Sequence, residues 1–177
     1  MNSLHYFSID KTYKMKYGKY EYERIFLLDN DCLRNKRIES TKKIKDKYLK
    51  DTNLRLREVK ENNSIKFKLT KKEKLNPDKK GILKLNTLYL TKSEFDKFYI
   101  FDGFEIKKER HMIQVDQIRI GIDNIILSNM SLFIAEVEFE TEDKMNTFSM
   151  PLSYIKEITG EKQYSGFELA KVYSKSK

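Results

Sequence analysis

The feature that most constrains the fold is a series of short segments in which apolar residues alternate with charged residues of one sign. Leu54 and Leu56, for example, alternate with Arg55 and Arg57. A period of two residues is typical of a β-strand with one apolar face. The sequence therefore predicts strands in seven segments: 20–28, 52–59, 64–70, 83–90, 104–115, 117–123 and 131–140.

Three other segments are expected to be helical. Ser93 is expected to cap a helix that runs to residue 99, Thr141 opens a second with acidic residues in its first turn, and residues 165–173 form a third. Residues 71–81 contain turn-forming residues and are expected to be a solvated loop. Many closely spaced strands with few helices favour an α+β fold, with an antiparallel barrel or strongly curved sheet and helices packed outside.

The charged residues form five pairs, each of a single sign and each on alternate positions. Residues two apart in a strand lie roughly 6.5–7 Å apart on one face. If the sheet closes, this face lines the interior while the apolar face packs against helices. Like charges inside a barrel are costly unless a ligand and metal ions neutralise them. The pairs are Glu21 and Glu23, Arg55 and Arg57, Lys66 and Lys68, Lys108 and Arg110, and Glu136 and Glu138.

These residue types suit phosphate chemistry. Carboxylates are the oxygen ligands that Mg²⁺ and Mn²⁺ favour. Arginine binds phosphate oxygens through its bidentate fork, and lysine binds them as a point charge. The alternative interpretation is that these pairs lie on solvent-exposed strand faces of an unrelated β-rich domain.

Composition and charge narrow the classes of function. The net charge is +9, and residues 34–84 carry 19 Lys and Arg against 7 Asp and Glu. Such a basic region could bind a polyanion or nucleic acid. The alternative is that it forms a lysine-rich, solvated surface. The aromatic residues within this region are Tyr48 and Phe67 only. They are too few for a surface on which bases stack, so recognition of single-stranded RNA is not favoured. One cysteine and two histidines leave no disulfide or HExxH zinc site. With no apolar run of membrane-spanning length, we expect a cytoplasmic protein that does not enter membranes.

The charge pairs and several further motifs follow one another in an order that resembles the CYTH domain of the triphosphate tunnel metalloenzymes. The resemblance extends from about residue 20 to about residue 172. It implies a domain over 20–177, with 1–19 as an N-terminal extension. The motifs are Glu21-Tyr22-Glu23, Leu54-Arg55-Leu56-Arg57, Phe67-Lys68, Lys108-Glu109-Arg110, Ile122-Asp123, Ala135-Glu136-Val137-Glu138-Phe139, Ile155-Lys156-Glu157-Ile158-Thr159, Tyr164 and Leu169-Ala170.

The resemblance implies an eight-stranded antiparallel tunnel that binds a triphosphate with Mg²⁺ or Mn²⁺. Lys156 would polarise a phosphate or a water molecule, and it would form the catalytic set with Glu23 and Glu138. The implied metal ligands are Glu21, Glu23, Asp123, Glu136 and Glu138, and the implied phosphate ligands are Arg55, Arg57, Lys68, Lys108 and Arg110.

Three positions depart from the pattern of that family. Ile25 stands where a lysine is expected, residues 83–90 lack the carboxylates of a middle strand, and Gln163 replaces an arginine. Two interpretations follow. The first is a metal-dependent phosphohydrolase acting on inorganic tripolyphosphate, a nucleoside triphosphate or thiamine triphosphate. The second is a non-catalytic nucleotide- or polyphosphate-binding protein, a sensor or a sequestering protein. A nucleic-acid-binding barrel is a third and less favoured reading, and the sequence leaves the oligomeric state open.

Overall fold

The computed structural model describes residues 18–76, 78–127 and 130–175, so residues 1–17 of the expected N-terminal extension lie outside the described part. Strands dominate these residues. The long strands are β1 (Lys19–Leu28), β2 (Ile38–Leu49), β3 (Leu54–Glu61), β4 (Ser64–Lys74), β5 (Ile82–Leu90), β6 (Gly103–Val115), β7 (Ile118–Leu127) and β8 (Met130–Phe139). The shorter elements are α1 (Lys92–Tyr99), α2 (Glu142–Asn146), β9 (Lys156–Glu157), a 3₁₀ turn at Lys162–Tyr164 and α3 (Gly166–Lys175).

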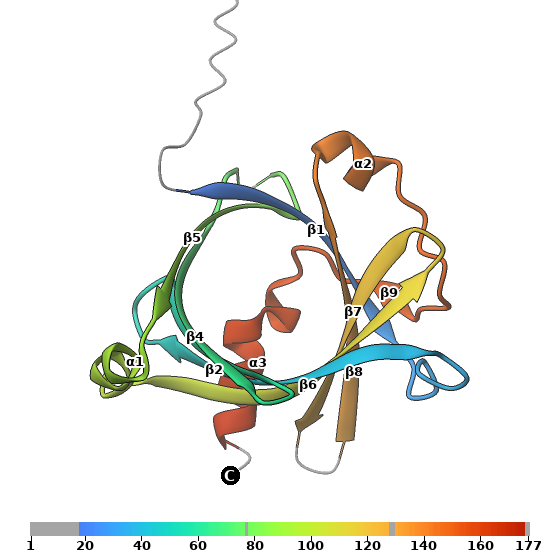
Figure 1. The fold of residues 1–177 in the computed structure, drawn as a ribbon. Coiled ribbons are helices and arrows are strands. Elements are labelled where there is room, and N and C mark those ends of the chain that lie inside the picture. The colour runs from blue at the N-terminus through green and yellow to red at the C-terminus, as the bar shows by residue number, and fades with distance from the viewer. Residues whose placement is uncertain (1–17, 77, 128–129, 176–177) are drawn as a thin grey trace, which may run out of the picture.

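The eight long strands close into an antiparallel barrel (Figure 1). Their order is β5-β4-β3-β2-β6-β7-β8-β1, and β1 returns to β5 through pairs such as Lys19 with Leu85. β9 adds two residues to the edge of β1. The expected α+β fold, an eight-stranded barrel with a few helices, is therefore confirmed.

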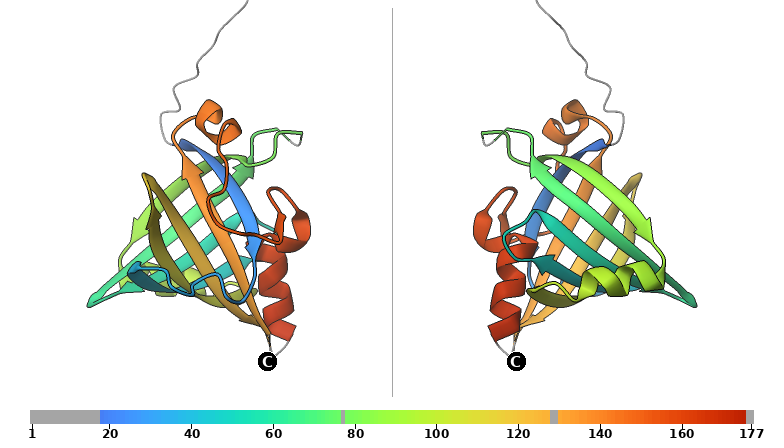
Figure 2. Two further views of the ribbon diagram at one scale, coloured as in Figure 1. Left: turned by 90° about the vertical axis from the view of Figure 1, so that its right-hand side faces the viewer. Right: turned by 90° about the vertical axis from the view of Figure 1, so that its left-hand side faces the viewer.

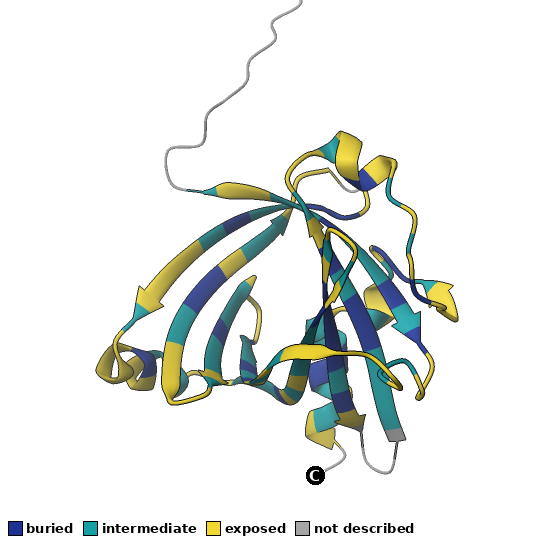
Figure 3. Ribbon diagram, turned by 45° about the vertical axis from the view of Figure 1, so that its right-hand side comes forward, coloured by how far each residue is buried: buried dark blue, intermediate teal, exposed yellow. Residues whose placement is uncertain are grey.

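Strand alternation places the apolar residues on the outer face of the barrel wall. Buried and less buried residues alternate along the strands (Figure 3). Leu56 of β3 and Leu69 of β4 pack against Phe95 of α1. On another part of the wall, Phe26 and Val137 belong to a cluster covered by residues that follow β8, such as Leu152. The opposite face of each strand, which carries the charge pairs, is therefore left to the interior.

Helix α3 crosses one end of the barrel (Figures 1 and 2). Its Leu169 and Ala170 belong to a buried cluster with Ile106 of β6 and Ile134 of β8. The ring of Phe167 packs edge-to-face against Phe104 and Tyr48, with ring centroids 5.6 and 6.3 Å away. This end of the interior is thus apolar and covered.

The helices agree with the expected segments except at one cap. Thr91, not Ser93, is the N-cap of α1, because its hydroxyl accepts from the Glu94 backbone N–H while the Glu94 carboxylate accepts from Thr91. This reciprocal pair is a capping box, which satisfies two backbone N–H groups at once. Thr141 caps α2 as expected.

Two strand assignments need correction. β2 falls in a region where no strand was predicted, because lysines on its outer face and Asp46 on its inner face hide the apolar alternation. β4 continues to Lys74, so residues 71–74 are not part of a loop. They pair with β5, with Lys72 opposite Leu85 and Lys74 opposite Leu83. In the described part of the chain, no helix is both long and apolar enough to cross a membrane.

Candidate functional site in the barrel interior

The interior face collects most of the residues predicted to form the site. Strand register fixes this, since Arg57 lies opposite Asp46 and Lys68, and Arg110 lies opposite Asp123. Several of these side chains keep partial contact with solvent, from 11% of the Glu21 side chain to 25% of that of Glu136. The charged residues form three groups of ion pairs.

The first group joins β2 and β3. Asp46 is 1% exposed, and Arg57 donates to it from Nε to Oδ1 at 2.6 Å and from Nη2 to Oδ2 at 2.7 Å. Burial by itself would raise the pKa of Asp46, but Arg57 and then Arg55 outweigh it and hold that pKa well below its ordinary value. The carboxylate therefore stays charged and fixes the guanidinium of Arg57.

Arg55 is held less tightly than Arg57. Its Nε lies 4.0 Å from Oδ1 of Asp46, too far for a hydrogen bond. That Nε is buried, and it finds no hydrogen-bond partner among the described residues. The side chain is 20% exposed. A buried N–H donor without an acceptor is costly, so Arg55 is suited to receive an anion.

Lys68 is a second interior cation near this wall. It lies on β4 opposite Arg57, and its Nζ lies 5.0 Å from the ring centroid of Tyr89 on β5. Tyr89 is 71% exposed. β5, the strand without carboxylates, also places Thr87 within 3.0 Å of the Thr70 hydroxyl. The β3–β4–β5 wall is therefore cationic and hydroxyl-rich.

The second group links β6, β7 and β8. Arg110 donates to both oxygens of Asp123, from Nε at 2.6 Å and from Nη2 at 2.7 Å, and it also binds Glu136. Lys108 binds Asp123 and lies 3.7 Å from Glu136. Burial would raise the pKa of Glu136, but Arg110 and Lys108 hold it well below its ordinary value. Two cations and two carboxylates thus neutralise each other on this wall.

The third group lies between β1 and β4. Lys72 Nζ lies 3.0 Å from Oε2 of Glu21 and 3.1 Å from each carboxylate oxygen of Glu23. Burial would lower the pKa of Lys72, but Glu23 and Glu21 reverse the effect and raise it. Burial raises the pKa of Glu23 to about 7, against the pull of Lys72 and with help from the like charges of Glu21 and Glu136.

The carboxylates fit a hard divalent cation by their chemistry. Glu21 and Glu23 share the inner face of β1, and Glu138 of β8 is the Cα partner of Glu23. Oxygen donors of this kind suit Mg²⁺ or Mn²⁺. As the side chains stand, no group of three or more His, Cys, Asp or Glu residues in the described part is arranged to hold a metal ion. The cation partners Lys72, Lys108 and Arg110 engage the oxygens instead.

Two of the predicted catalytic residues lie apart from these groups. Glu138 is exposed, although its register places it beside Glu23. Lys156 lies on β9 with 54% of its side chain exposed, and it pairs with Glu161 at 2.6 Å. Their catalytic roles stay predictions.

Ile25, which replaces an expected lysine, belongs to the apolar end of the barrel. It packs against the buried cluster that contains Ile134, Ile158 and Leu169. The position that would carry a cation is therefore part of the packing under α3.

Sequence reasoning missed Asp46 and Lys72. Asp46 lies two residues from Ile44 and Tyr48, a period-two signal that the lysines of residues 42–47 obscure. Lys72 continues the alternation Lys68, Thr70, Lys72 along β4, and extending that strand by two residues would have found it.

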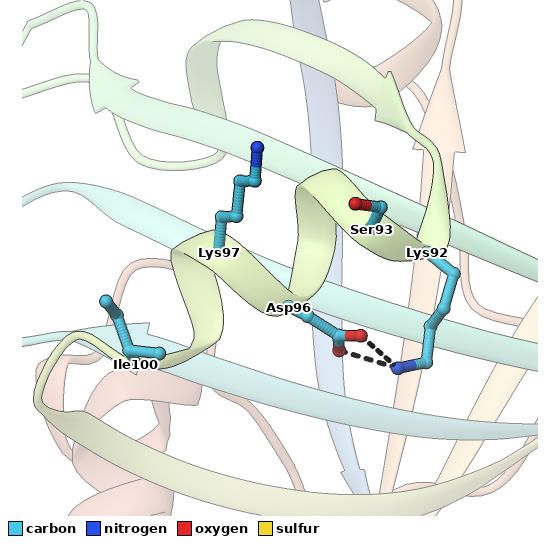
Figure 4. Close-up of a pocket in the computed structure, with 5 residues that line it drawn as sticks. All are labelled: Lys92, Ser93, Asp96, Lys97 and Ile100. Carbon is cyan, nitrogen blue, oxygen red and sulfur yellow. Dashed lines mark hydrogen bonds and ion pairs between the residues drawn. The ribbon is translucent and has the colours of Figure 1, made fainter.

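The outer surface has an open depression along α1, outside the barrel (Figure 4). Lys92 and Asp96 line it and form an ion pair with each other, one helical turn apart. It contains none of the residues predicted to form the site, so the interior remains the candidate site.

No protein-family model matches the sequence, and no curated protein is significantly similar to it. Solved structures do share its fold. Inorganic triphosphatase NE1496 is 18% identical, with a TM-score of 0.55, over 85% of this chain and 93% of that one. The PH1819 protein from Pyrococcus horikoshii is 16% identical, with a TM-score of 0.55, over 71% and 82%. A putative adenylate cyclase from Bacillus halodurans is 15% identical, with a TM-score of 0.50, over 73% and 85%.

The chain shares the fold of these structures, a closed eight-stranded antiparallel barrel of the tunnel type. The resemblance to the CYTH domain is confirmed at the level of the fold.

Proposed function

We propose that the barrel interior binds the phosphate chain of a triphosphate and hydrolyses it with the help of a divalent cation. The observation that carries the proposal is the buried Nε of Arg55, which has no acceptor within the described part of the chain while its guanidinium faces the partly solvated interior. A phosphate oxygen is the acceptor that this donor needs, and arginine presents two parallel N–H groups to it.

Neighbouring cations extend this contact into a site for a chain of phosphates. Arg57 lies two residues along β3, and Lys68 lies opposite Arg57 on β4. Lys108 and Arg110 supply two more positive charges from β6. Phosphoryl transfer is catalysed mainly by positioning and charge stabilisation, which is what such a set provides.

The residues that would hold a divalent cation are Glu21, Glu23 and Glu138, with Asp123 and Glu136 on the neighbouring strands. When bound, Mg²⁺ or Mn²⁺ would neutralise phosphate charge and lower the pKa of a water molecule. As a ligand, Glu23 would stay charged, because the charge of the cation would oppose the burial that raises the pKa of this carboxyl. Lys156 would have to leave Glu161 to reach a phosphate.

Inorganic tripolyphosphate is the first substrate we propose. The name of one structural neighbour, inorganic triphosphatase NE1496, supports this choice. Nucleoside and thiamine triphosphates share the phosphate chain and are the next candidates.

The test is phosphate release from tripolyphosphate, ATP and thiamine triphosphate, each with Mg²⁺, Mn²⁺ or EDTA. We expect metal-dependent release that Arg55→Ala weakens and Lys60→Ala does not. Lys60 is a matched control, because it lies on the same strand with its side chain on the outer face, paired with Glu58. Release that is equal in both variants would contradict the proposal.

A non-catalytic polyphosphate-binding protein is the second candidate. Ile25 favours it, because the expected lysine is replaced by a side chain packed into an apolar cluster. Tight binding of tripolyphosphate without release under any metal condition would select this candidate.

A further inference from the structure

We propose that Lys72 is a built-in counter-cation of the Glu21–Glu23 pair, and that it must leave this pair before a divalent cation can bind there. The inference rests on the proposed function, because it concerns the same carboxylates. It adds a residue that controls when the interior accepts a metal ion.

The geometry around Lys72 supports this inference. Its Nζ lies 3.0 Å from one oxygen of Glu21 and 3.1 Å from both oxygens of Glu23. The ammonium therefore lies among three carboxylate oxygens contributed by two residues of β1. It reaches them from β4, a strand that is separated from β1 by β5.

A divalent cation would need the same oxygens. Mg²⁺ binds oxygen at about 2.0–2.1 Å, so it would have to lie among them, where the ammonium now lies. Two cations at that separation would also repel each other strongly in a poorly solvated site. The Lys72 ammonium and a metal ion bound to both glutamates are therefore mutually exclusive.

Lys72 has an alternative partner in the proposed complex. Arg55 lies close enough to Lys72 for its positive charge to lower the pKa of Lys72. Both cations therefore lie in the same region of the interior. A phosphate bound at Arg55 would attract the Lys72 ammonium on its flexible stem. Phosphate binding would thereby release Glu21 and Glu23 to a metal ion, and the two ligands would bind cooperatively.

The experiment measures Mn²⁺ binding without any phosphate, by calorimetry and by the electron paramagnetic resonance signal of free Mn²⁺. The proteins are the wild type, Lys72→Met and Lys68→Met. Lys68→Met is the matched control, since it removes an interior cation from the same face of β4, and Lys68 contacts Tyr89. We expect Lys72→Met to bind Mn²⁺ about tenfold more tightly than the other two, within the usual range of site coupling.

Three results would overturn the inference: no gain for Lys72→Met, an equal gain for Lys68→Met, or no Mn²⁺ binding by any of the three proteins. Lys72→Gln serves if the methionine variant does not fold, because the amide still donates hydrogen bonds to the glutamates. The proposed function is judged separately, by tripolyphosphate binding in EDTA and by metal-dependent phosphate release from the wild type, so the two failures are distinguishable.

Discussion

Arg57 donates to both carboxylate oxygens of Asp46 inside the barrel, at 2.6 and 2.7 Å. Asp46 lies on β2 and Arg57 on β3, and the two residues are Cα partners in the sheet. Asp46 fixes Arg57 but leaves Arg55 with an Nε–H that finds no acceptor in residues 18–76, 78–127 and 130–175. The pair therefore orients the wall on which we expect a phosphate to bind.

Replacing Asp46 is expected to destabilise the fold severely. Asp46→Asn removes the charge that neutralises Arg57, and breaking a buried ion pair in this way costs about 3–5 kcal/mol. Urea denaturation of the variant measures the loss. Asp102→Asn is the control, because Asp102 pairs with Lys50 at the surface, where ion pairs add little to stability. Equal losses in the two variants would disprove a special role for Asp46.

The raised pKa of Glu23 predicts that the stability of the fold depends on pH. Its pKa is raised to about 7 in the folded protein, above the value of about 4.3 in an unfolded chain. Between these values the folded state binds more protons, so this residue lowers the free energy of unfolding as pH rises from about 4.3 to about 7. The full effect is up to about 4 kcal/mol.

Denaturation in EDTA at pH 5 and pH 8 checks this prediction. Glu23→Gln should gain stability relative to the wild type between the two pH values, because the amide does not ionise. A constant difference between the two proteins would show that Glu23 titrates normally.

Restoring the expected lysine at position 25 should damage the protein. Ile25 packs against the cluster that holds Leu169 of α3, so Ile25→Lys places an ammonium against apolar side chains at a cost of about 2 kcal/mol or more. Ile25→Val should cost only about 0.5–1.5 kcal/mol. Thermal denaturation compares the two. A lysine variant that is as stable as the wild type and hydrolyses tripolyphosphate faster would contradict this packing argument.

Glu138→Gln should remove metal-dependent phosphate release while leaving the fold intact. Glu138 is exposed, so the amide costs little stability, yet its register places it beside Glu23 among the expected metal ligands. Phosphate release and circular dichroism measure the two effects. Glu140→Gln is the control, an exposed residue of the same segment that pairs with Lys144. Unchanged release in Glu138→Gln would remove this residue from the site.

Period-two alternation in seven segments predicted an antiparallel barrel or a strongly curved sheet, and the resemblance to the CYTH domain implied the closed eight-stranded tunnel that the structure has. Prediction from the sequence failed at β2, where lysines and Asp46 obscure the alternation of Ile44 and Tyr48. Because β2 was not predicted as a strand, Asp46 was not recognised as an interior residue.

The ion-pair partners of the interior side chains could not be predicted from the sequence. The motif order placed Glu21, Glu23, Arg110 and Glu136 in the interior, but their partners come from distant strands. Lys72 meets Glu23 across 49 residues of chain. Only barrel closure and register bring such residues together, and the same closure turns Ile25 toward α3 instead of toward a ligand.

The most direct test of the central claim is calorimetric titration of tripolyphosphate into the protein in EDTA. We predict that the wild type and Lys60→Ala bind with equal affinity, and that Arg55→Ala binds about tenfold or more weakly, as expected for loss of a hydrogen bond to a charged group of about 1.5–3 kcal/mol. Absence of binding by the wild type, or equal binding by Arg55→Ala, would contradict the claim that the interior cations hold a phosphate chain.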